Sequence, residues 1–177
     1  MYTRRRGREL ALKLLYGFDM LPRDIDTTLQ EFWSLTRYPE EVRKFAEQLV
    51  RGTLGHRGEI DAFIAENAIN WAIDRMAVVD RNILRYAVYE LLYEDVIPPK
   101  VTINEALDVA KKYSTPKSSA FINGILDNIH HTIVTRKRLL AKEKRKKRKR
   151  KSKENVPTQS ESLLPTNHTN EHEKRTE

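Results

Sequence analysis

One apolar stretch, Ala77 to Tyr93, limits the folds that this chain can adopt. At 100° per residue, its apolar side chains cover roughly half of the circumference of a helix. They are Val79, Ile83, Leu84, Tyr86, Ala87, Val88 and Leu91. The polar residues of the stretch are expected together on the opposite, exposed side: Asp80, Arg81, Asn82 and Arg85. A helix with so wide an apolar face packs against several neighbours, so the stretch predicts the central helix of a helical bundle.

Glu90 is the exception in this pattern, because its direction falls inside the apolar arc. A carboxylate buried there without a donor or a positive partner would cost several kcal/mol. We therefore expect a structural hydrogen bond from a neighbouring helix, in preference to the role of a catalytic acid.

Helical spacing of apolar residues continues through most of the chain, and no segment alternates with the period of a strand. Residues 10–18, 25–33 and 121–133 each predict one helix. A longer pattern starts near Pro39 and predicts one long helix that bends at its glycines and ends about Asn67. The glycines are expected to let another helix come close: Gly52, Gly55 and Gly58. The total is an all-α fold of about six to seven helices.

A capping box is predicted after the loop that contains Pro98 and Pro99. The hydroxyl of Thr102 can accept a hydrogen bond from the backbone amide of Glu105, while the Glu105 side chain reaches back to the backbone amide of Thr102. This pattern places the start of a helix at Thr102, and the helix ends in Lys111-Lys112, as the helix dipole favours.

Charge divides the 177 residues into a domain, 1–135, and a tail, 136–177. Residues 1–135 carry 18 Lys or Arg and 19 Asp or Glu, whereas residues 136–153 carry 13 and one, a net charge of +12. We expect the basic run to fray by self-repulsion and the polar segment from Ser152 onward to be disordered. The chain has no cysteine and no apolar run long enough to span a membrane, which indicates a soluble, cytoplasmic protein of a reducing compartment.

Four arginines surround the first turn of the first predicted helix: Arg4, Arg5, Arg6 and Arg8. The helix dipole favours acidic residues at this end, so another benefit should offset the arrangement. Phosphate binding and a merely solvated, charged end are both compatible with this pattern.

Signals of catalysis are weak, because the chain has no phosphate-cradling glycine loop, no nucleophile elbow and no histidine pair at metal-binding spacing. No enzyme and no cofactor are expected. Exposed basic residues instead favour nucleic acid: Arg81, Arg85, Lys100, Lys111, Lys112 and Lys117. Phe121, at a junction of loop and helix, either stacks on an unpaired base or belongs to the core.

Five blocks, in one order and at compatible spacing over residues 3–133, make this chain similar to the NusB transcription antitermination proteins. They are Arg4-Arg-Arg-Gly-Arg-Glu-Leu with the residues up to Tyr16, Asn70-Trp71, Val79-Asp-Arg-Asn-Ile-Leu-Arg up to Leu91, residues 99–106, and residues 121–127. The resemblance implies two packed helical subdomains. It also implies a cytoplasmic role in binding the boxA element of ribosomal RNA leaders jointly with the ribosomal protein NusE. Together with other Nus factors, this complex would act on RNA polymerase.

Site residues follow from the resemblance by position. The expected RNA contacts are Arg4, Arg5, Arg6, Arg8, Lys100, Lys117, Phe121 and Asn123. The partner protein is expected on the exposed side of the central helix, at Asp80 and Arg81. Two positions depart from the family pattern, because Lys117 stands where an acidic residue is usual and Ala120 where a lysine is usual.

Two other functions, and the role of the tail, remain open at this point. A NusB-like helical domain also forms the N-terminal part of ribosomal RNA cytosine methyltransferases, so the chain could be an RNA-binding module without the catalytic domain. A purely structural scaffold would leave the arginine cluster without a purpose. The basic tail could either reinforce RNA binding non-specifically or only increase solubility.

Overall fold

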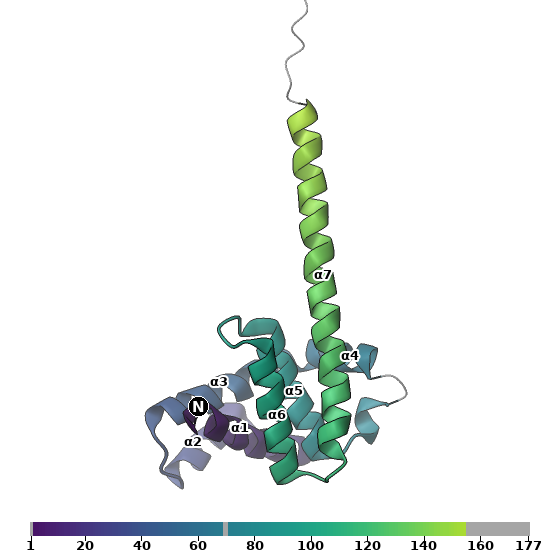
Figure 1. The fold of residues 1–177 in the computed structure, drawn as a ribbon. Helices are drawn as coiled ribbons and strands as arrows, with labels where there is room; N and C mark the ends of the chain where they lie inside the picture. Colours follow the sequence, from purple (N-terminus) through teal and green to yellow (C-terminus); the bar gives the residue numbers. More distant parts are fainter. Residues whose placement is uncertain (1, 69–70, 155–177) are drawn as a thin grey trace, which may run out of the picture. The chain divides into compact units, whose positions relative to one another are not determined.

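The computed structural model describes residues 2–68 and 71–154, and this part of the chain contains seven α-helices, one short 3₁₀ turn and no strand (Figure 1). The elements are α1 (Tyr2–Met20), α2 (Ile25–Ser34), α3 (Glu40–Gly55), α4 (Arg57–Asn67), η1 (Ile73–Arg75), α5 (Val78–Tyr93), α6 (Pro99–Tyr113) and α7 (Ser118–Glu154). The predicted all-α fold is confirmed.

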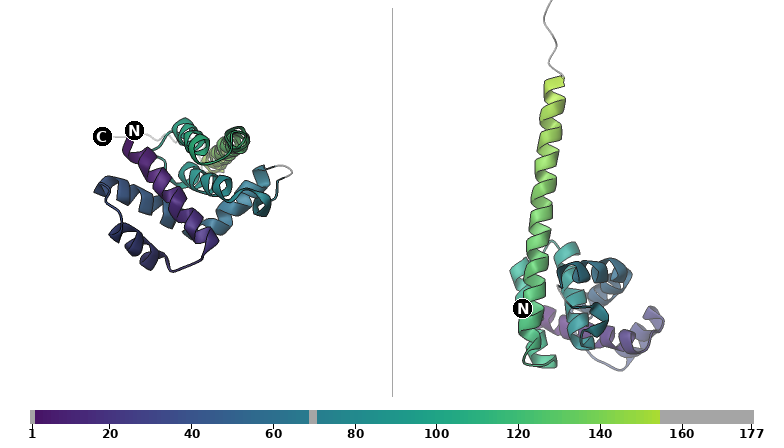
Figure 2. Two further views of the ribbon diagram at one scale, coloured as in Figure 1. Left: turned by 90° about the horizontal axis from the view of Figure 1, so that it is seen from below. Right: turned by 90° about the vertical axis from the view of Figure 1, so that its right-hand side faces the viewer.

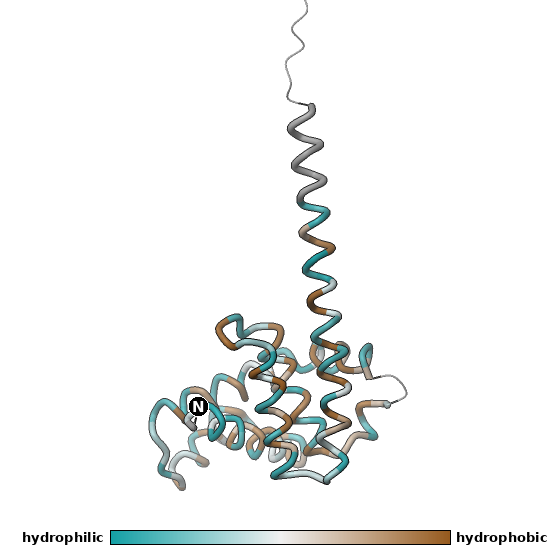
Figure 3. Tube along the Cα trace, viewed as in Figure 1, coloured by the Kyte–Doolittle hydropathy of each residue, from teal (hydrophilic) through white to brown (hydrophobic). Residues whose placement is uncertain are grey.

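Residues 1–138 form one compact unit around a single apolar core. In this unit α1 contacts α3 on one side and α5 and α6 on the other, as the view from below shows (Figure 2). Hydrophobic and hydrophilic residues alternate along the helices with the helical period (Figure 3). The fully buried leucine and isoleucine side chains of the core include Leu10, Leu15, Leu49, Ile60, Ile64, Ile83, Leu84, Ile122, Leu126 and Ile129.

The predicted central helix is α5, which contacts α1, α3, α4 and α6. Its burial is more complete than the sequence indicates, because every residue from Asn82 to Glu90 is buried. Asp80 and Arg85, on the side predicted to face solvent, are buried as well. The expectation of an exposed polar side on this helix was therefore wrong.

Asp19, at the end of α1, explains how the polar side of α5 is buried. Its carboxylate accepts hydrogen bonds from Arg81 at 2.9 Å, Arg85 at 2.8 Å and Asn82 at 3.1 Å. Asp61 on α4 accepts two further bonds from Arg85, at 2.7 and 2.8 Å. Arg81 and Arg85 are thus not the exposed cations that the sequence suggested, because both pair with Asp19, whose side chain is largely covered, and Arg85 also pairs with the half-buried Asp61.

Glu90 has the structural partner that its position in the apolar arc requires. Arg8 on α1 donates two hydrogen bonds to the Glu90 carboxylate, at 2.7 and 2.8 Å, and Thr102 on α6 donates a third at 3.0 Å. The side chains of Arg8 and Glu90 are 1% and 0% exposed. The ion pair therefore joins α1, α5 and α6 inside the core, and the predicted hydrogen bond to a neighbouring helix is confirmed.

The predicted long helix is in fact two helices, α3 and α4, which meet at His56. The His56 backbone ends α3 by donating to the Gly52 carbonyl at 3.1 Å, and it also precedes the first turn of α4. A side chain at Gly52 would collide with the Tyr89 ring of α5, whereas Gly55 and Gly58 have open space around them. The expected close helix approach thus occurs at one of the three glycines.

The start of α6 also differs from the prediction. Pro98 is the N-cap and Pro99 occupies the first helical position, where the missing amide hydrogen has no intrahelical partner to lose. The helix therefore begins three residues before Thr102. The capping box is not formed, because the Thr102 hydroxyl binds Glu90 and the Glu105 carboxylate binds Arg5.

A continuous helix, α7, runs through the basic run that was expected to fray after residue 135 and reaches Glu154. Residues 136–154 contain no Gly or Pro and consist mainly of good helix formers, which offset the like-charge repulsion. Contacts divide the chain between Arg138 and Leu139, three residues beyond the predicted boundary. The disorder predicted from Ser152 onward is wrong for residues 152–154, which belong to α7, and its remaining part, residues 155–177, falls outside the described residues.

None of the described helices has both the length and the apolar character needed to cross a membrane.

The buried ion pair predicts a sharp asymmetry between single and double substitutions. Arg8→Met should lower the free energy of unfolding by about 3–5 kcal/mol, because it leaves the Glu90 carboxylate buried without its positive partner. Arg8→Met combined with Glu90→Met should restore most of this loss. Urea unfolding measures both, with Arg4→Met as an exposed control that should change stability by less than about 0.5 kcal/mol. A double variant as unstable as Arg8→Met would contradict this explanation.

Stability should also depend on pH through Asp19. Burial favours a raised pKa, but the bond from Arg81 and the nearby charges of Arg85 and Arg57 outweigh it and lower the pKa of Asp19. A carboxyl with a lowered pKa in the folded state stabilises the fold above its unfolded pKa of about 3.9 and loses this contribution as the pH falls.

Asp19→Asn should therefore be clearly less stable than the unmodified protein at neutral pH, and the difference should shrink in acid. Urea unfolding at pH 7 and near pH 3 tests this expectation. A difference that stays constant, or grows, as the pH falls would show that Asp19 is not ionised in the folded state.

Candidate nucleic-acid interface

The four N-terminal arginines have different environments, and Arg8 is a correction to the sequence-based assignment. Its guanidinium is bound to Glu90 inside the core and also lies 3.6 Å from Glu105. A phosphate cannot reach a side chain that is 1% exposed. Arg8 is therefore a structural residue and not an RNA contact.

Arg5 joins α1 to α6 through ion pairs near the surface, whereas the ion pair of Arg6 lies within α1. Arg5 donates to Glu105 at 2.8 Å and to Asp108 at 2.7 Å, both on α6. The hydrogen bond to Glu105, followed by the negative charges of Glu105 and Asp108, raises the pKa of Arg5. Arg6 pairs with Glu9 at 2.6 Å, which raises the pKa of Arg6. The Arg5 side chain is still 47% exposed, so its outer edge remains accessible.

Arg4 is exposed, and no ion pair is found for it within the described residues. Its guanidinium lies 5.9 Å from the centre of the Phe45 ring. Arg4 and Phe45 line a groove of about 500 Å³ between α1, α3 and the start of α6, where Pro98 and Val101 form the far wall. Lys100 lies between these two residues in sequence and is exposed, and in the part of the chain that the structure describes it has no ion pair either, so two such cations are near this groove.

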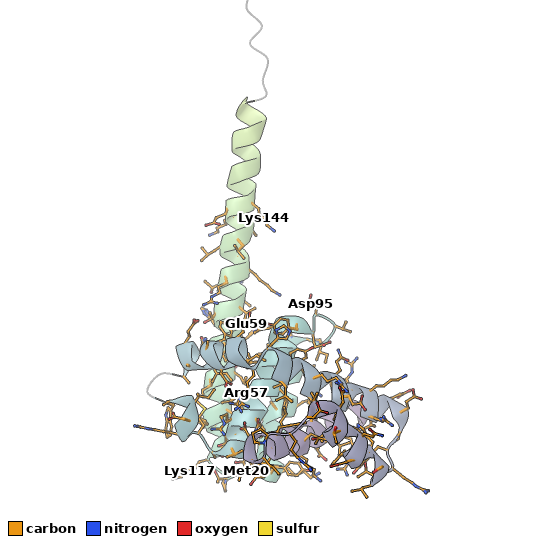
Figure 4. All side chains as sticks on the ribbon, turned by 180° about the vertical axis from the view of Figure 1, so that it is seen from behind. Met20, Arg57, Glu59, Asp95, Lys117 and Lys144 are labelled. Carbon is orange, nitrogen blue, oxygen red and sulfur yellow. The ribbon has the colours of Figure 1, made fainter. Side chains whose placement is uncertain are left out.

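A second cavity of about 330 Å³ lies where the α6–α7 connection meets η1 and the start of α5. It is lined by Trp71, Arg75, Asp80, Lys117 and Phe121, among others. The rings of Trp71 and Phe121 meet edge to face, with centres 5.2 Å apart and planes at 66°. Lys117 is exposed, and its position is labelled in the view from behind (Figure 4).

Phe121 combines the two roles that the sequence left open. It is half-buried and packs against the core, while it also lines the cavity next to Trp71. Trp71 is 54% exposed and was not singled out as a site residue, although it belongs to one of the family blocks. Asn123 is not among the residues that line this cavity, and its amide donates to Asp127 at 3.0 Å.

The two residues predicted to bind the partner protein, Asp80 and Arg81, both have partners within the fold. The Asp80 carboxylate is buried and accepts hydrogen bonds from Ser114 at 2.6 Å and Ser118 at 2.8 Å. Arg81 pairs with Asp19. Asp80 thus fixes the α6–α7 connection that carries Lys117. In the sequence, the only indication of this role of Asp80 was the pair of hydroxyl donors in the connection, Ser114 and Ser118.

Helix α6 connects the groove and the cavity, which lie at its two ends. Its 15 residues span about 22 Å at 1.5 Å per residue. Asp108 accepts from both Arg5 and Lys111, so these cations share one side of α6, and Lys112 pairs with Glu9 of α1 at 2.7 Å. We define the basic strip by its exposed cations: Arg4, Arg5, Lys100, Lys111, Lys112 and Lys117.

Glu9, which belongs to α1, pairs with Lys112 in the middle of the basic strip. Burial favours a raised pKa, but hydrogen bonds from Lys112, Arg6 and Tyr113 outweigh it, so the pKa of Glu9 is lowered. The carboxylate is therefore ionised at neutral pH and keeps Lys112 in place. Among the described residues, the strip thus has cations with acidic partners in its middle, and cations for which no ion pair is found at its two ends.

Comparisons with known proteins agree with this arrangement. Residues 5–131 match the family model described as NusB family. The chain is 48% identical over 129 residues to the "Transcription antitermination protein NusB" of Trichlorobacter lovleyi, with 73% of this chain and 91% of the relative covered.

Two solved structures are similar in fold. A NusB structure from T. maritima gives a TM-score of 0.65 at 37% identity, covering 72% of this chain and 90% of that one. A structure of the antitermination factors NusB and NusE in complex with dsRNA gives a TM-score of 0.66 at 28% identity, covering 75% and 98%. The match of the family model over most of the compact unit, together with these relatives, shows that the chain belongs to the NusB family.

Proposed function

We propose that this protein is a transcription antitermination factor that binds the boxA element of ribosomal RNA leaders jointly with NusE. With other Nus factors it would act on elongating RNA polymerase in the cytoplasm, without catalysis and without a cofactor. The name of the T. lovleyi relative supports the antitermination role, and the complex of NusB, NusE and dsRNA supports both kinds of partner. The relative's name also favours this function over the methyltransferase-related alternative.

The observation that carries the RNA-binding part is the position of three exposed cations: Arg4, Lys100 and Lys117. Within the described residues, no ion pair is found for any of them. Most other cations near α1 and α6 already pair with acids of the protein. A cation that is exposed and lacks an acidic partner can bind a phosphate without giving up an existing ion pair.

The cavity at Trp71 and Phe121 supplies a contact of another kind. Aromatic faces stack on unpaired bases of single-stranded RNA, whereas phosphate contacts alone only position the strand. Lys117 lines the same cavity, so a phosphate next to a stacked base would meet a positive charge there. We therefore propose that the strip holds the strand by its backbone and that the aromatic pair receives one base.

Removing the three cations should weaken RNA binding and lower its dependence on salt. For Arg4→Ala, Lys100→Ala and Lys117→Ala combined, the slope of log affinity against log salt should fall by about 2, since each phosphate contact to a single strand contributes about 0.7. The matched control removes three exposed cations elsewhere: Arg23→Ala, Arg37→Ala and Lys44→Ala. Equal effects of the two triple variants on boxA RNA would show that only net charge matters.

Substitution of the aromatic pair should separate binding from stability. Trp71→Ala should change the free energy of unfolding by less than about 0.5 kcal/mol, because the residue is exposed, and should weaken RNA binding by about 1–3 kcal/mol. Phe121→Ala should lose RNA affinity and also some stability, since the ring is half-buried.

The buried control on the same helix is Ile125→Ala, which should lose about 2–5 kcal/mol of stability and keep RNA affinity well below its melting temperature. Thermal unfolding and fluorescence titration on each variant give both quantities. Unchanged RNA affinity in Trp71→Ala and Phe121→Ala would remove the stacking contact from the proposal.

A further inference from the structure

The second unit of the chain contains a basic helical segment, residues 139–154, which we name the basic arm. It carries ten Lys or Arg and two Glu, a net charge of +8. The match to the family model ends at residue 131, so the arm lies beyond the domain that the family shares. Arg136 and Lys137 precede it and pair with Glu66 and Asp95 of the compact unit.

The helical conformation concentrates the charge of the arm. At 1.5 Å per residue the arm is about 24 Å long, which gives one cation for about every 2.4 Å. An extended chain of the same sequence would separate its cations by about 5 Å on average. Double-stranded nucleic acid carries one negative charge for about every 1.7 Å of its axis. The helix thus has a linear charge density of the same order as a nucleic acid.

The sequence of the arm fits a polyanion and not a lipid surface. Nine of the ten residues from Lys142 to Lys151 are Lys or Arg, and none of the ten is apolar. An amphipathic helix on a membrane needs a continuous apolar face. The only large apolar residues of the arm, Leu139 and Leu140, are consecutive and lie at its start.

The arm also lacks the residues of base recognition by stacking, because residues 139–154 contain no aromatic side chain. Dense cations without such residues bind phosphates alike in any sequence. Like charges four residues apart repel each other along a helix, and bound phosphates relieve this repulsion. Lys144 is exposed and labelled on α7 in Figure 4.

We propose that the basic arm is a second, sequence-independent RNA-binding element, which binds the phosphates of RNA that flanks the element bound by the compact unit. This proposal rests on the proposed function for the identity of the RNA. Because the arm is joined covalently to the compact unit, its high effective concentration near a bound strand turns weak phosphate contacts into a gain in affinity. A chain without the arm would bind the short element alone equally well.

The test uses the full-length protein and two single-stranded RNAs. One RNA holds only the boxA element, and the other adds unstructured flanks of about 15 nucleotides on each side, within the range of sites for single strands. The neutralised variant replaces the seven cations from Lys144 to Arg150 by Gln, which is also a good helix former. A second variant, Glu143→Pro with Lys147→Pro, interrupts the helix and keeps the net charge of the arm.

The unmodified protein should bind the flanked RNA more tightly than the short RNA, and the neutralised variant should bind both with similar affinity. On flanked RNA, neutralisation should lower the slope of log affinity against log salt by up to about 5. The affinity of the proline variant for the flanked RNA should lie between those of the unmodified protein and the neutralised variant. Equal affinity and slope for the neutralised and the unmodified protein would overturn the proposal, and a proline variant equal to the unmodified protein would overturn the role of the helix.

Flank RNA without boxA separates this proposal from the proposed function. If no protein binds the short RNA but the unmodified protein still binds the flank more tightly than the neutralised variant, the proposed function fails and the arm proposal stands. If the short RNA is bound and the flank adds nothing, the arm proposal fails alone. If the arm increases the affinity for duplex DNA but not for RNA, the arm binds another nucleic acid, and the proposal as stated is overturned.

Discussion

The buried ion pair between Arg8 and Glu90 is the interaction on which the rest of this structure depends. Two charges in a dry core cost several kcal/mol each in lost hydration, and only close geometry with further hydrogen bonds offsets that cost. Here the pair is bidentate, and Thr102 supplies a third donor to the carboxylate. Because these residues come from α1, α5 and α6, the relative placement of three helices is fixed at one point.

That placement decides which cations are left for a ligand. With α1 held against α6, Arg5 faces Glu105 and Asp108 of α6, while Arg6 pairs with Glu9 of its own helix. Arg4, one residue earlier, extends beyond these acids and lies near the groove at the start of α6. The same cluster of arginines thus supplies a core ion pair, surface ion pairs and one exposed cation. The proposed RNA interface therefore includes the exposed cations that do not pair with acids of the fold.

The sequence predicted the helices well and the partners of its charges poorly. Apolar periodicity placed α5 within one residue, and the position of Glu90 in the apolar arc required a partner. Periodicity cannot tell which distant cation fills that role, so Arg8 was assigned to RNA. For the same reason the sequence did not reveal the role of Asp19. This residue pairs with three arginines of α4 and α5, and these ion pairs lie on the side of α5 that was expected to face solvent.

Local patterns misled where tertiary contacts offered better partners. Thr102 and Glu105 have the spacing of a capping box, but Glu90 and Arg5 bind them more favourably than the local backbone. The cavity between Trp71 and Phe121 joins segments 50 residues apart, which no local pattern reveals. Conversely, the basic run after residue 135 followed its helix propensity, although charge repulsion alone predicted fraying.

The division of the arginines into core and ligand-binding residues can be observed directly by NMR of the Nε–H groups of isotopically labelled arginine. The Arg8 Nε–H, bound to Glu90 at 2.7 Å, should exchange slowly with solvent and keep its resonance when boxA RNA is added. The Arg4 resonance should exchange rapidly in the free protein and shift in proportion to bound RNA. An Arg8 resonance that shifts when RNA is added, while the Arg4 resonance stays unchanged, would contradict the assignment of Arg8 to the core and of Arg4 to RNA binding.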